Sequence, residues 1–347
     1  MPRRGLAGLS PVELKQQEGR EQDVTLTRRS MVLGAATTPF APPLAHAQSW
    51  PSGPIRLIVP FPPAGSTDVL ARLVQTGLQQ RLSANIIIEN KPGASGAAGT
   101  AVFAKSPPDG NAWLFVFDTH SVNPYLMNLQ YDTEKDLDPV MLIATAPYLL
   151  AVNTKHEFKN LADVIAAAKS KPDGLSYASV GSGSIGHLFM VLLQKKTGMK
   201  LTHVPYRGGG PAMNDALGGH VDFIVGSVAL VTPQLGSGKL RPIVQTGEKR
   251  VAALPDVATV MESGVPDLTA YTWWGVFAPA GTPKPIVERF HKELTASIRE
   301  ERVTKALTES QQMTLALSTP EELRAFSTAQ GKLWGPVVKE NDIKGEM

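Results

Sequence analysis

Hydrophobic positions from residue 54 onward follow two alternating spacings. Short β-branched runs predict strands, and apolar residues three, four and eight positions apart predict amphipathic helices. In the first part of the chain, strands are expected at 55–59, 86–88 and 113–117. One helix is expected to begin at a cap on Ser66 or Thr67, with Asp68 in its first turn, and a glycine-rich segment, 91–100, leads into a short helix ending near Lys105. This βαβαβ order indicates a parallel sheet covered on both faces.

The same alternation returns after Asn160. Further helices are expected at 161–169, 185–197, 211–217 and 283–298, and further strands at 175–179, 201–205 and 223–225. Thr319-Pro320-Glu321-Glu322 has the form of a capping box with proline at the first helical position, which predicts the start of a long last helix. Two α/β lobes with a cleft between them are the simplest architecture for this pattern.

Composition adds that the chain is globular and works without thiols. Its 347 residues are 42% hydrophobic and 19% charged, which fits one or two domains with an ordinary core. There is no cysteine, so disulfides, thiolate nucleophiles and iron–sulfur clusters are excluded. The 31 glycines and 28 prolines favour many turns between short elements over a helical bundle.

Residues 1–47 have the features of an export signal that is removed. Arg28-Arg29 precedes a modest apolar stretch, and Ala45-His46-Ala47 has the small-x-small form of a signal-peptidase site, so the segment resembles a twin-arginine leader. A Sec-type leader or a disordered N-terminal arm are the alternatives. Six of the 34 basic and four of the 31 acidic side chains lie in 1–47, so the remaining chain has 28 basic and 27 acidic side chains. This balance excludes nucleic acid and anionic membranes as partners, and we expect a soluble periplasmic protein.

Two glycine- and serine-rich turns are the best candidates for chemistry. Gly181–Gly186 has the G-x-G-x-x-G spacing of a dinucleotide site, but the next strand ends without the acid that holds a ribose. The segment instead offers amides and hydroxyls at a helix N-terminus, which suit an anion, and Pro62–Asp68 repeats this arrangement. Two such turns facing each other would hold a small organic acid. The alternative is that both are only tight strand-to-helix turns.

Other motifs give no catalytic, metal or cofactor site. Ser184 and His187 suggest a hydrolase, but the chain has no G-x-S-x-G elbow. The acidic run 132–138 lacks the glycine and terminal glutamate of a calcium loop and reads as a solvated loop. No H-E-x-x-H pair is present. Trp273 and Trp274 lie in a strand-like run, where alternation places at least one of them in the core.

From about Trp50 to Ile343 the chain resembles the extracytoplasmic solute receptors of tripartite tricarboxylate transporters, the Bug receptors. Eight motifs carry the resemblance and keep their order along the chain. They are Pro60-Phe61-Pro62-Pro63-Ala64-Gly65-Ser66-Thr67-Asp68, Glu89-Asn90-Lys91-Pro92-Gly93-Ala94-Ser95-Gly96, Pro107-Pro108-Asp109-Gly110, Asn123-Pro124, Gly181-Ser182-Gly183-Ser184-Ile185-Gly186-His187, His203-Val204-Pro205-Tyr206-Arg207-Gly208, Leu254-Pro255-Asp256-Val257-Ala258-Thr259-Val260 and Ala278-Pro279-Ala280-Gly281-Thr282-Pro283.

The resemblance implies a periplasmic-binding-protein-like α/β fold, in which two α/β domains joined by a hinge close on a ligand in the cleft between them. It places domain 1 at 48–147 plus 272–347 and domain 2 at 148–271. Residues carried over as holding a ligand carboxylate are Phe61, Ala64, Gly65, Thr67, Asp68, Ser182, Ser184 and His187. Pocket walls carried over in the same way are His120, Asn123, Tyr206, Ser227 and Trp273.

The implied function is capture of a small organic carboxylate, by a protein that is a monomer and not an enzyme, for delivery to membrane transporter subunits or a sensor protein. An exported α/β enzyme acting on a small acid and a binding module without a transporter are the alternatives. Two positions depart from the family pattern: Ala64 replaces the first glycine of a pair, and Gly226 stands where members often carry an acid. Because neither turn holds a lysine or arginine and Gly226 removes an acid, we expect a non-amino carboxylic acid to bind better than its amino-acid counterpart.

Overall fold

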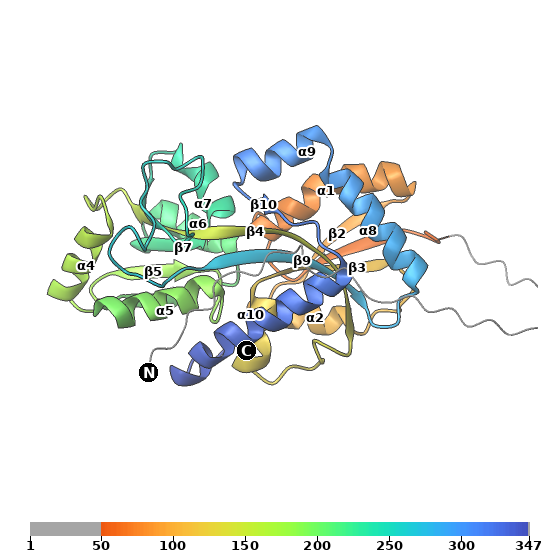
Figure 1. Ribbon diagram of the computed structural model, residues 1–347, viewed down its shortest axis with the longest axis horizontal. Helices are drawn as coiled ribbons and strands as arrows, with labels where there is room; N and C mark the ends of the chain where they lie inside the picture. The colour runs from red at the N-terminus through yellow and green to blue at the C-terminus, as the bar shows by residue number, and fades with distance from the viewer. Residues whose placement is uncertain (1–49, 346–347) are drawn as a thin grey trace, which may run out of the picture. The chain divides into compact units, whose positions relative to one another are not determined.

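A computed structural model describes residues 50–345 of the chain, which form a mixed α/β fold (Figure 1). Its main sheet has the strand order β2-β1-β3-β9-β4-β7-β5-β6, with β10 and β8 also paired to β4. The strands at the two ends of this order run parallel to their neighbours, and those in the middle run antiparallel. The sheet therefore divides into two parallel wings joined by an antiparallel centre.

The first lobe is built on β2, β1, β3, β9 and the first part of β4. Its elements before the crossing to the second lobe are β1 (Ile55–Val59), α1 (Ser66–Leu82), β2 (Ile86–Asn90), a 3-10 turn (Ala94–Gly96), α2 (Ala97–Phe103), β3 (Ala112–Phe117), α3 (Thr119–Leu126) and β4 (Leu137–Asn153). Those after the return are β9 (Tyr271–Pro279), α8 (Lys284–Ile298), α9 (Glu301–Lys305), a π-helical turn (Ala306–Ser310), β10 (Thr314–Leu315) and α10 (Pro320–Glu340).

The second lobe is built on the last part of β4 with β7, β5, β6 and β8. Its remaining elements are α4 (Leu161–Ser170), β5 (Ser176–Ser179), α5 (Ile185–Thr197), β6 (Thr202–Pro205), α6 (Gly209–Gly218), β7 (Phe223–Ser227), α7 (Val228–Leu235) and β8 (Leu240–Gln245).

The long strand β4 joins the lobes. Its residues from Leu137 to Pro147 pair with β9, whereas those from Tyr148 to Asn153 pair with β7 and β8. The chain returns along β9, whose first residue, Tyr271, lies opposite Pro147. Two adjacent strands thus cross between the lobes, an arrangement in which a few residues at the crossing can absorb a closing rotation.

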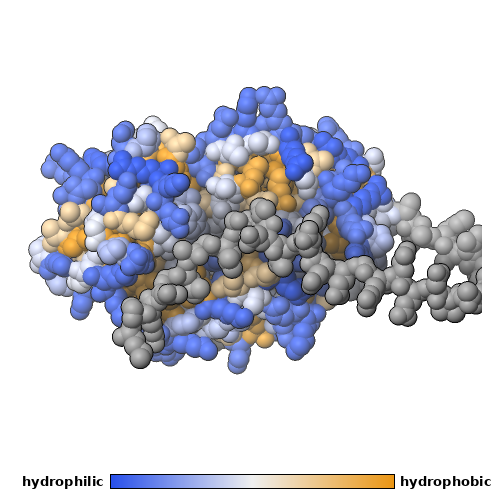
Figure 2. Space-filling model, in the orientation of Figure 1, coloured by the Kyte–Doolittle hydropathy of each residue, from blue (hydrophilic) through white to orange (hydrophobic). Residues whose placement is uncertain are grey.

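Helices cover both sides of the strands, with α1 and α8 above and α5 and α10 below in the view of Figure 1. The core beneath them is aromatic: Trp113 of β3 stacks on Phe290 of α8 with ring centroids 3.7 Å apart. Polar side chains dominate the face seen in Figure 2. Within residues 50–345 the large exposed apolar side chains are scattered, and none of the helices there is long and apolar enough to span a bilayer.

The expected helices and strands are present within a few residues of their predicted bounds, including the capping box of α10 between Thr319 and Glu322. The parallel arrangement expected for the strands at 55–59, 86–88 and 113–117 is confirmed in β1, β2 and β3, and β9, which returns from the second lobe, adds an antiparallel strand between β3 and β4. One prediction was wrong. Helix α1 begins at Ser66 behind an N-cap at Gly65 without a side-chain cap, so neither Ser66 nor Thr67 is the cap.

Candidate functional site

The loop between β1 and α1 is held in place by Asp68. This carboxylate is 2% exposed; it accepts a hydrogen bond from the Ala64 N–H at 3.0 Å and a bidentate pair from Arg72 at 2.9 and 3.0 Å. Asn90 of β2 donates to the second oxygen at 2.9 Å. Burial alone raises the pKa of Asp68, but the hydrogen bonds from Arg72, Asn90 and Ala64 lower it below its usual value. Asp68 therefore shapes the loop, with both oxygens occupied.

The turn before α5 is organised by the helix that follows it. Ser184 is the N-cap of α5; its hydroxyl accepts from the His187 N–H and donates to the Gly181 carbonyl at 2.8 Å. The Gly183 N–H donates to Nδ1 of His187 at 3.1 Å. Because a neutral imidazole that accepts at Nδ1 carries its proton on Nε2, the tautomer of His187 is settled by this contact. The single O–H of Ser184 is likewise committed within the turn.

A small cavity of about 20 Å³ lies where the lobes meet. Three helix N-termini surround it: Gly65–Thr67 from α1, Gly208-Gly209 from α6 and Ser227 from α7. The remaining walls are Phe61, Phe117, Val180 and Leu230. Among the described residues no charged side chain lines it. The partial positive charge of each of these helix starts therefore lies beside one space, which favours a small anion.

Four of the thirteen residues predicted for the site line this cavity, namely Phe61, Gly65, Thr67 and Ser227. Ala64 lines a neighbouring groove between α1, α6 and α7. Ser182, Ser184 and His187 form the turn before α5, and Asp68 lies behind the first loop. The cavity also has walls outside the set of predicted site residues: Ser66, Phe117, Val180, Gly208, Gly209 and Leu230.

Some of the cavity residues that were not predicted could have been identified from the direction of the strands. Phe117 ends β3 and Val180 follows β5, and ligands in open α/β sheets bind at the carboxyl ends of parallel strands. Gly208 is the last residue of the His203–Gly208 motif, and Gly209 directly follows it. Leu230 has no local signal, because only the packing of α7 brings it to the cavity.

The other predicted walls make contacts within the protein. Trp273 is fully buried and packs edge-on against Phe326 of α10, and its neighbour Trp274 is buried against Phe117, so both indoles lie in the core. His120 is buried beside Phe277, and burial lowers its pKa to about 4. Outside the core, the Tyr206 hydroxyl donates to Asp215 at 2.5 Å.

Asp118 connects the two lobes. This fully buried carboxyl follows β3 in the first lobe and accepts a short hydrogen bond from the hydroxyl of Tyr148, which lies just past the crossing on β4. Burial raises the pKa of Asp118 to about 7, although the hydrogen bond from Tyr148 acts in the opposite direction. No motif in the sequence singles out Asp118 or Tyr148.

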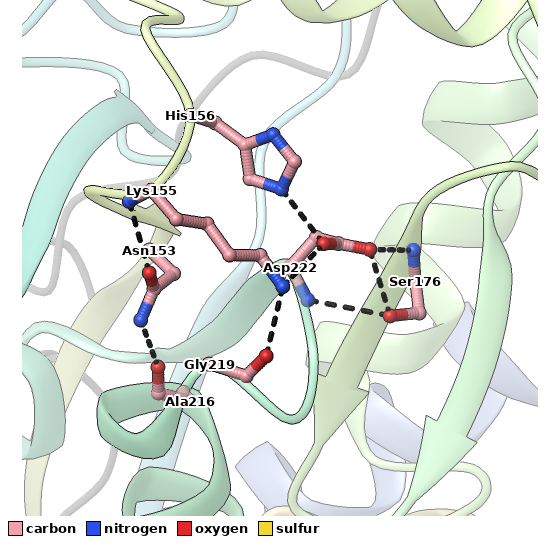
Figure 3. A network of polar contacts seen from close by, with 7 residues as sticks. All are labelled: Asn153, Lys155, His156, Ser176, Ala216, Gly219 and Asp222. Atoms are coloured by element: carbon pink, nitrogen blue, oxygen red, sulfur yellow. Dashed lines mark hydrogen bonds and ion pairs between the residues drawn. The ribbon is translucent and has the colours of Figure 1, made fainter.

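A second polar cluster surrounds Asp222 (Figure 3). Its carboxylate accepts from His156 Nε2 at 2.7 Å, pairs with Lys155 at 3.0 Å, and accepts from the Ser176 N–H at 2.8 Å. Asp222 precedes β7 and Ser176 begins β5, whereas the cavity residues Ser227 and Val180 lie at the other ends of those strands. The cluster therefore lies at the opposite ends of these strands from the cavity, where it stabilises the second lobe.

The fold and the cavity together define a two-lobed solute-binding protein. The family model described as the tripartite tricarboxylate transporter family receptor matches residues 70–343. Protein BugT of Bordetella pertussis (strain Tohama I) is 34% identical over 326 residues, covering 92% of this chain and 99% of that protein. The chain therefore belongs to the tripartite tricarboxylate transporter receptor family, whose members are solute receptors.

Two solved structures agree with this assignment. An R. palustris protein with adipate is 31% identical with a TM-score of 0.80, covering 85% of this chain and 99% of that one. MatC from Rhodopseudomonas palustris with bound malate is 30% identical with a TM-score of 0.78, covering 83% of this chain and all of that one. Both are similar to this protein over the whole two-lobed fold.

Proposed function

We propose that this receptor captures a small, non-amino organic carboxylate between its lobes, without converting it, and delivers it to the membrane subunits of a tripartite tricarboxylate transporter. The observation that carries the proposal is the cavity between the lobes, where three helix N-termini converge and none of the described lining residues is basic. The N–H groups and dipoles at helix N-termini can bind one carboxylate without a basic side chain. The adipate and malate in the two similar structures are ligands of this class.

Ligand entry requires the lobes to separate. A cavity of about 20 Å³ has room for about one water molecule, so a four-carbon acid cannot reach it while the loops 60–65 and 206–210 touch. The proposed division into domains, 48–147 plus 272–347 against 148–271, places these two loops on opposite sides of the hinge. Closure then buries the carboxylate, which strengthens its hydrogen bonds.

The expected preference for a carboxylic acid without an amino group rests on the aspartate side chains near the cavity. Both oxygens of Asp68 are occupied, and Asp118, one oxygen of which is bonded to Tyr148, is fully buried and does not line the cavity. An ammonium group would therefore be buried without a carboxylate partner, which costs several kcal/mol. We expect succinate to bind more tightly than aspartate, at least tenfold, in calorimetry on the ligand-stripped receptor.

The carboxylate class is tested by a thermal-shift panel of mono-, di- and tricarboxylates. A ligand at 100 times its Kd adds about 2.7 kcal/mol to the free energy of unfolding, which raises the melting temperature. No shift with any acid would reject the carboxylate proposal, and chemical conversion of a bound acid would reject the receptor role. Tighter binding of aspartate would reject only the charge preference, and would point to Asp118 as the partner of its ammonium.

Thr67→Val tests the cavity itself. Thr67 is 3% exposed and lines the cavity, and valine keeps its shape while removing the hydroxyl. We expect a tenfold or greater loss of affinity, because a hydrogen bond to a charged group contributes about 1.5–3 kcal/mol. Thr202→Val, on the exposed end of edge strand β6, is the matched control and should bind as the wild type does. Equal affinity in both variants would remove Thr67 from the site.

A further inference from the structure

Ser95 has an unusual backbone conformation for a residue with a side chain. It lies in the 3-10 turn between β2 and α2 of the first lobe, with φ 51° and ψ 35°, in the left-handed region. Only glycine visits this region freely, and other residues stay there when the surroundings compensate. The Asn123 side-chain amide of α3 donates to the Ser95 carbonyl at 3.2 Å and helps to hold the backbone in place.

The side chain of Ser95 reaches the other lobe. Its hydroxyl donates to the carbonyl oxygen of Ser182 at 2.9 Å, and both residues are buried. Ser182 belongs to the turn before α5 in the second lobe, part of the predicted anion-binding set. This is a direct hydrogen bond between the lobes, and it ends on the segment that the ligand is expected to approach.

The turn before α5 fits the first lobe only because it carries glycines at two points. Gly181 has φ 146°, and a Cβ there would lie 2.8 Å from the Ser95 hydroxyl oxygen. A Cβ on Gly183, with φ 75°, would overlap the side chain of Leu126 on α3. These close contacts run between the lobes, so separation of the lobes breaks them together with the Ser95 hydrogen bond.

We propose that Ser95 is a positioning residue that latches the closed receptor by donating its hydroxyl to the Ser182 carbonyl. The inference builds on the proposed function, since it concerns closure around the ligand, but Ser95 need not touch the ligand itself. When the lobes open, water replaces the hydroxyl at the Ser182 carbonyl. The latch therefore stabilises the closed state only by the net free energy of an uncharged hydrogen bond. We expect its loss to reduce the closed-to-open ratio about two- to tenfold.

The variant that isolates the latch is Ser95→Gly. Glycine accepts the left-handed conformation, so the variant loses the hydroxyl without adding strain to the fold. The chain offers a matched control in Ser83→Gly: Ser83 has φ 50° and ψ 39° at the exposed C-terminal end of α1. Both variants should melt at or above the wild-type temperature, and only Ser95→Gly should alter closure.

Closure can be measured without any ligand. The chain has no cysteine, so spin labels can be attached at Lys284→Cys on α8 and Lys169→Cys on α4, which are exposed positions in different lobes. In the ligand-free protein, Ser95→Gly should move the distance distribution toward longer separations, whereas Ser83→Gly should reproduce the wild type. An unchanged distribution in Ser95→Gly would overturn the latch, whether or not a carboxylate binds.

Ligand kinetics give a second readout. With succinate as the probe, Ser95→Gly should dissociate about two- to tenfold faster than Ser83→Gly, while association stays within a factor of two. Dissociation at the control rate would overturn the latch. If succinate binds none of the proteins, the distance measurement still decides the role of Ser95, so failure of the carboxylate proposal remains distinguishable from failure of the latch.

Discussion

At the scale of single residues, two stacked histidines support the turn before α5. The rings of His187 and His203 lie 3.8 Å apart with 13° between their planes, and His203 Nε2 is 2.7 Å from the Ser179 hydroxyl. Burial, together with the neighbouring His203 ring, lowers the pKa of His187 to about 3, and burial lowers that of His203 to about 4. Both rings are therefore neutral throughout the physiological range.

This pair predicts acid sensitivity of the free energy of unfolding between pH 7 and 5. Below pH 6.5 the two histidines bind protons in the unfolded chain but stay neutral in the folded protein. The free energy of unfolding is therefore highest above pH 6.5 and falls as the pH drops toward 4. Each histidine contributes a loss on the order of 1–2 kcal/mol by pH 5. Urea unfolding of wild type and His203→Gln at the two pH values measures it.

The variant should lose part of the pH dependence. His220→Gln, at an exposed position outside the stack, is the control and should retain all of it. Equal pH dependence in wild type and His203→Gln would show that the stacked rings do not control acid stability.

At the scale of elements, Asp222 ties the loop after β4 to the starts of β5 and β7. Burial raises its pKa, but the hydrogen bonds from His156, the Ser176 N–H and Lys155 lower it to about 2. We expect Asp222→Asn to reduce the free energy of unfolding by about 1–3 kcal/mol at pH 7, without a change in ligand affinity, because the cavity lies at the other edge of the sheet.

The effect of Asp222 should fade in acid. Its carboxylate stabilises the fold above the unfolded pKa near 4, and this contribution is lost as the pH falls toward 2. Denaturant melts of wild type and Asp222→Asn should therefore converge between pH 4 and 2, with exposed Asp256→Asn following the wild type throughout. If the difference in free energy of unfolding between wild type and Asp222→Asn stayed constant from pH 4 to 2, the loss of stability would be due to packing and not to charge.

At the scale of the whole molecule, the two-strand crossing joins the lobes, and the predicted leader concerns export of the receptor. Arg28, Arg29 and the proposed cleavage after Ala47 lie outside the described residues, and export through a twin-arginine leader remains a prediction. We expect replacement of both arginines by lysine to leave uncleaved precursor in the cytoplasm, as measured by fractionation and mass spectrometry. Normal export of a protein beginning at Gln48 would instead favour a Sec-type leader.

The sequence alone determined the local elements and the family. Alternating apolar spacings and caps such as Thr319 are local signals, so helices and strands were placed within a few residues. Eight ordered motifs indicated the receptor family, which the comparisons confirmed. The Pro62–Asp68 turn was also recognisable as a helix start, because the residues that open a helix are a local signal; anion binding there stays a prediction.

Only the tertiary structure decided which groups remain available for a ligand. Local spacing cannot show that β9 lies antiparallel beside β3, or that α6 supplies a third helix start to the cavity. Each of these depends on residues far apart in the chain, whose pairing follows from packing of the whole core. The same holds for the bond from Ser95 to Ser182, which spans 87 positions and both lobes.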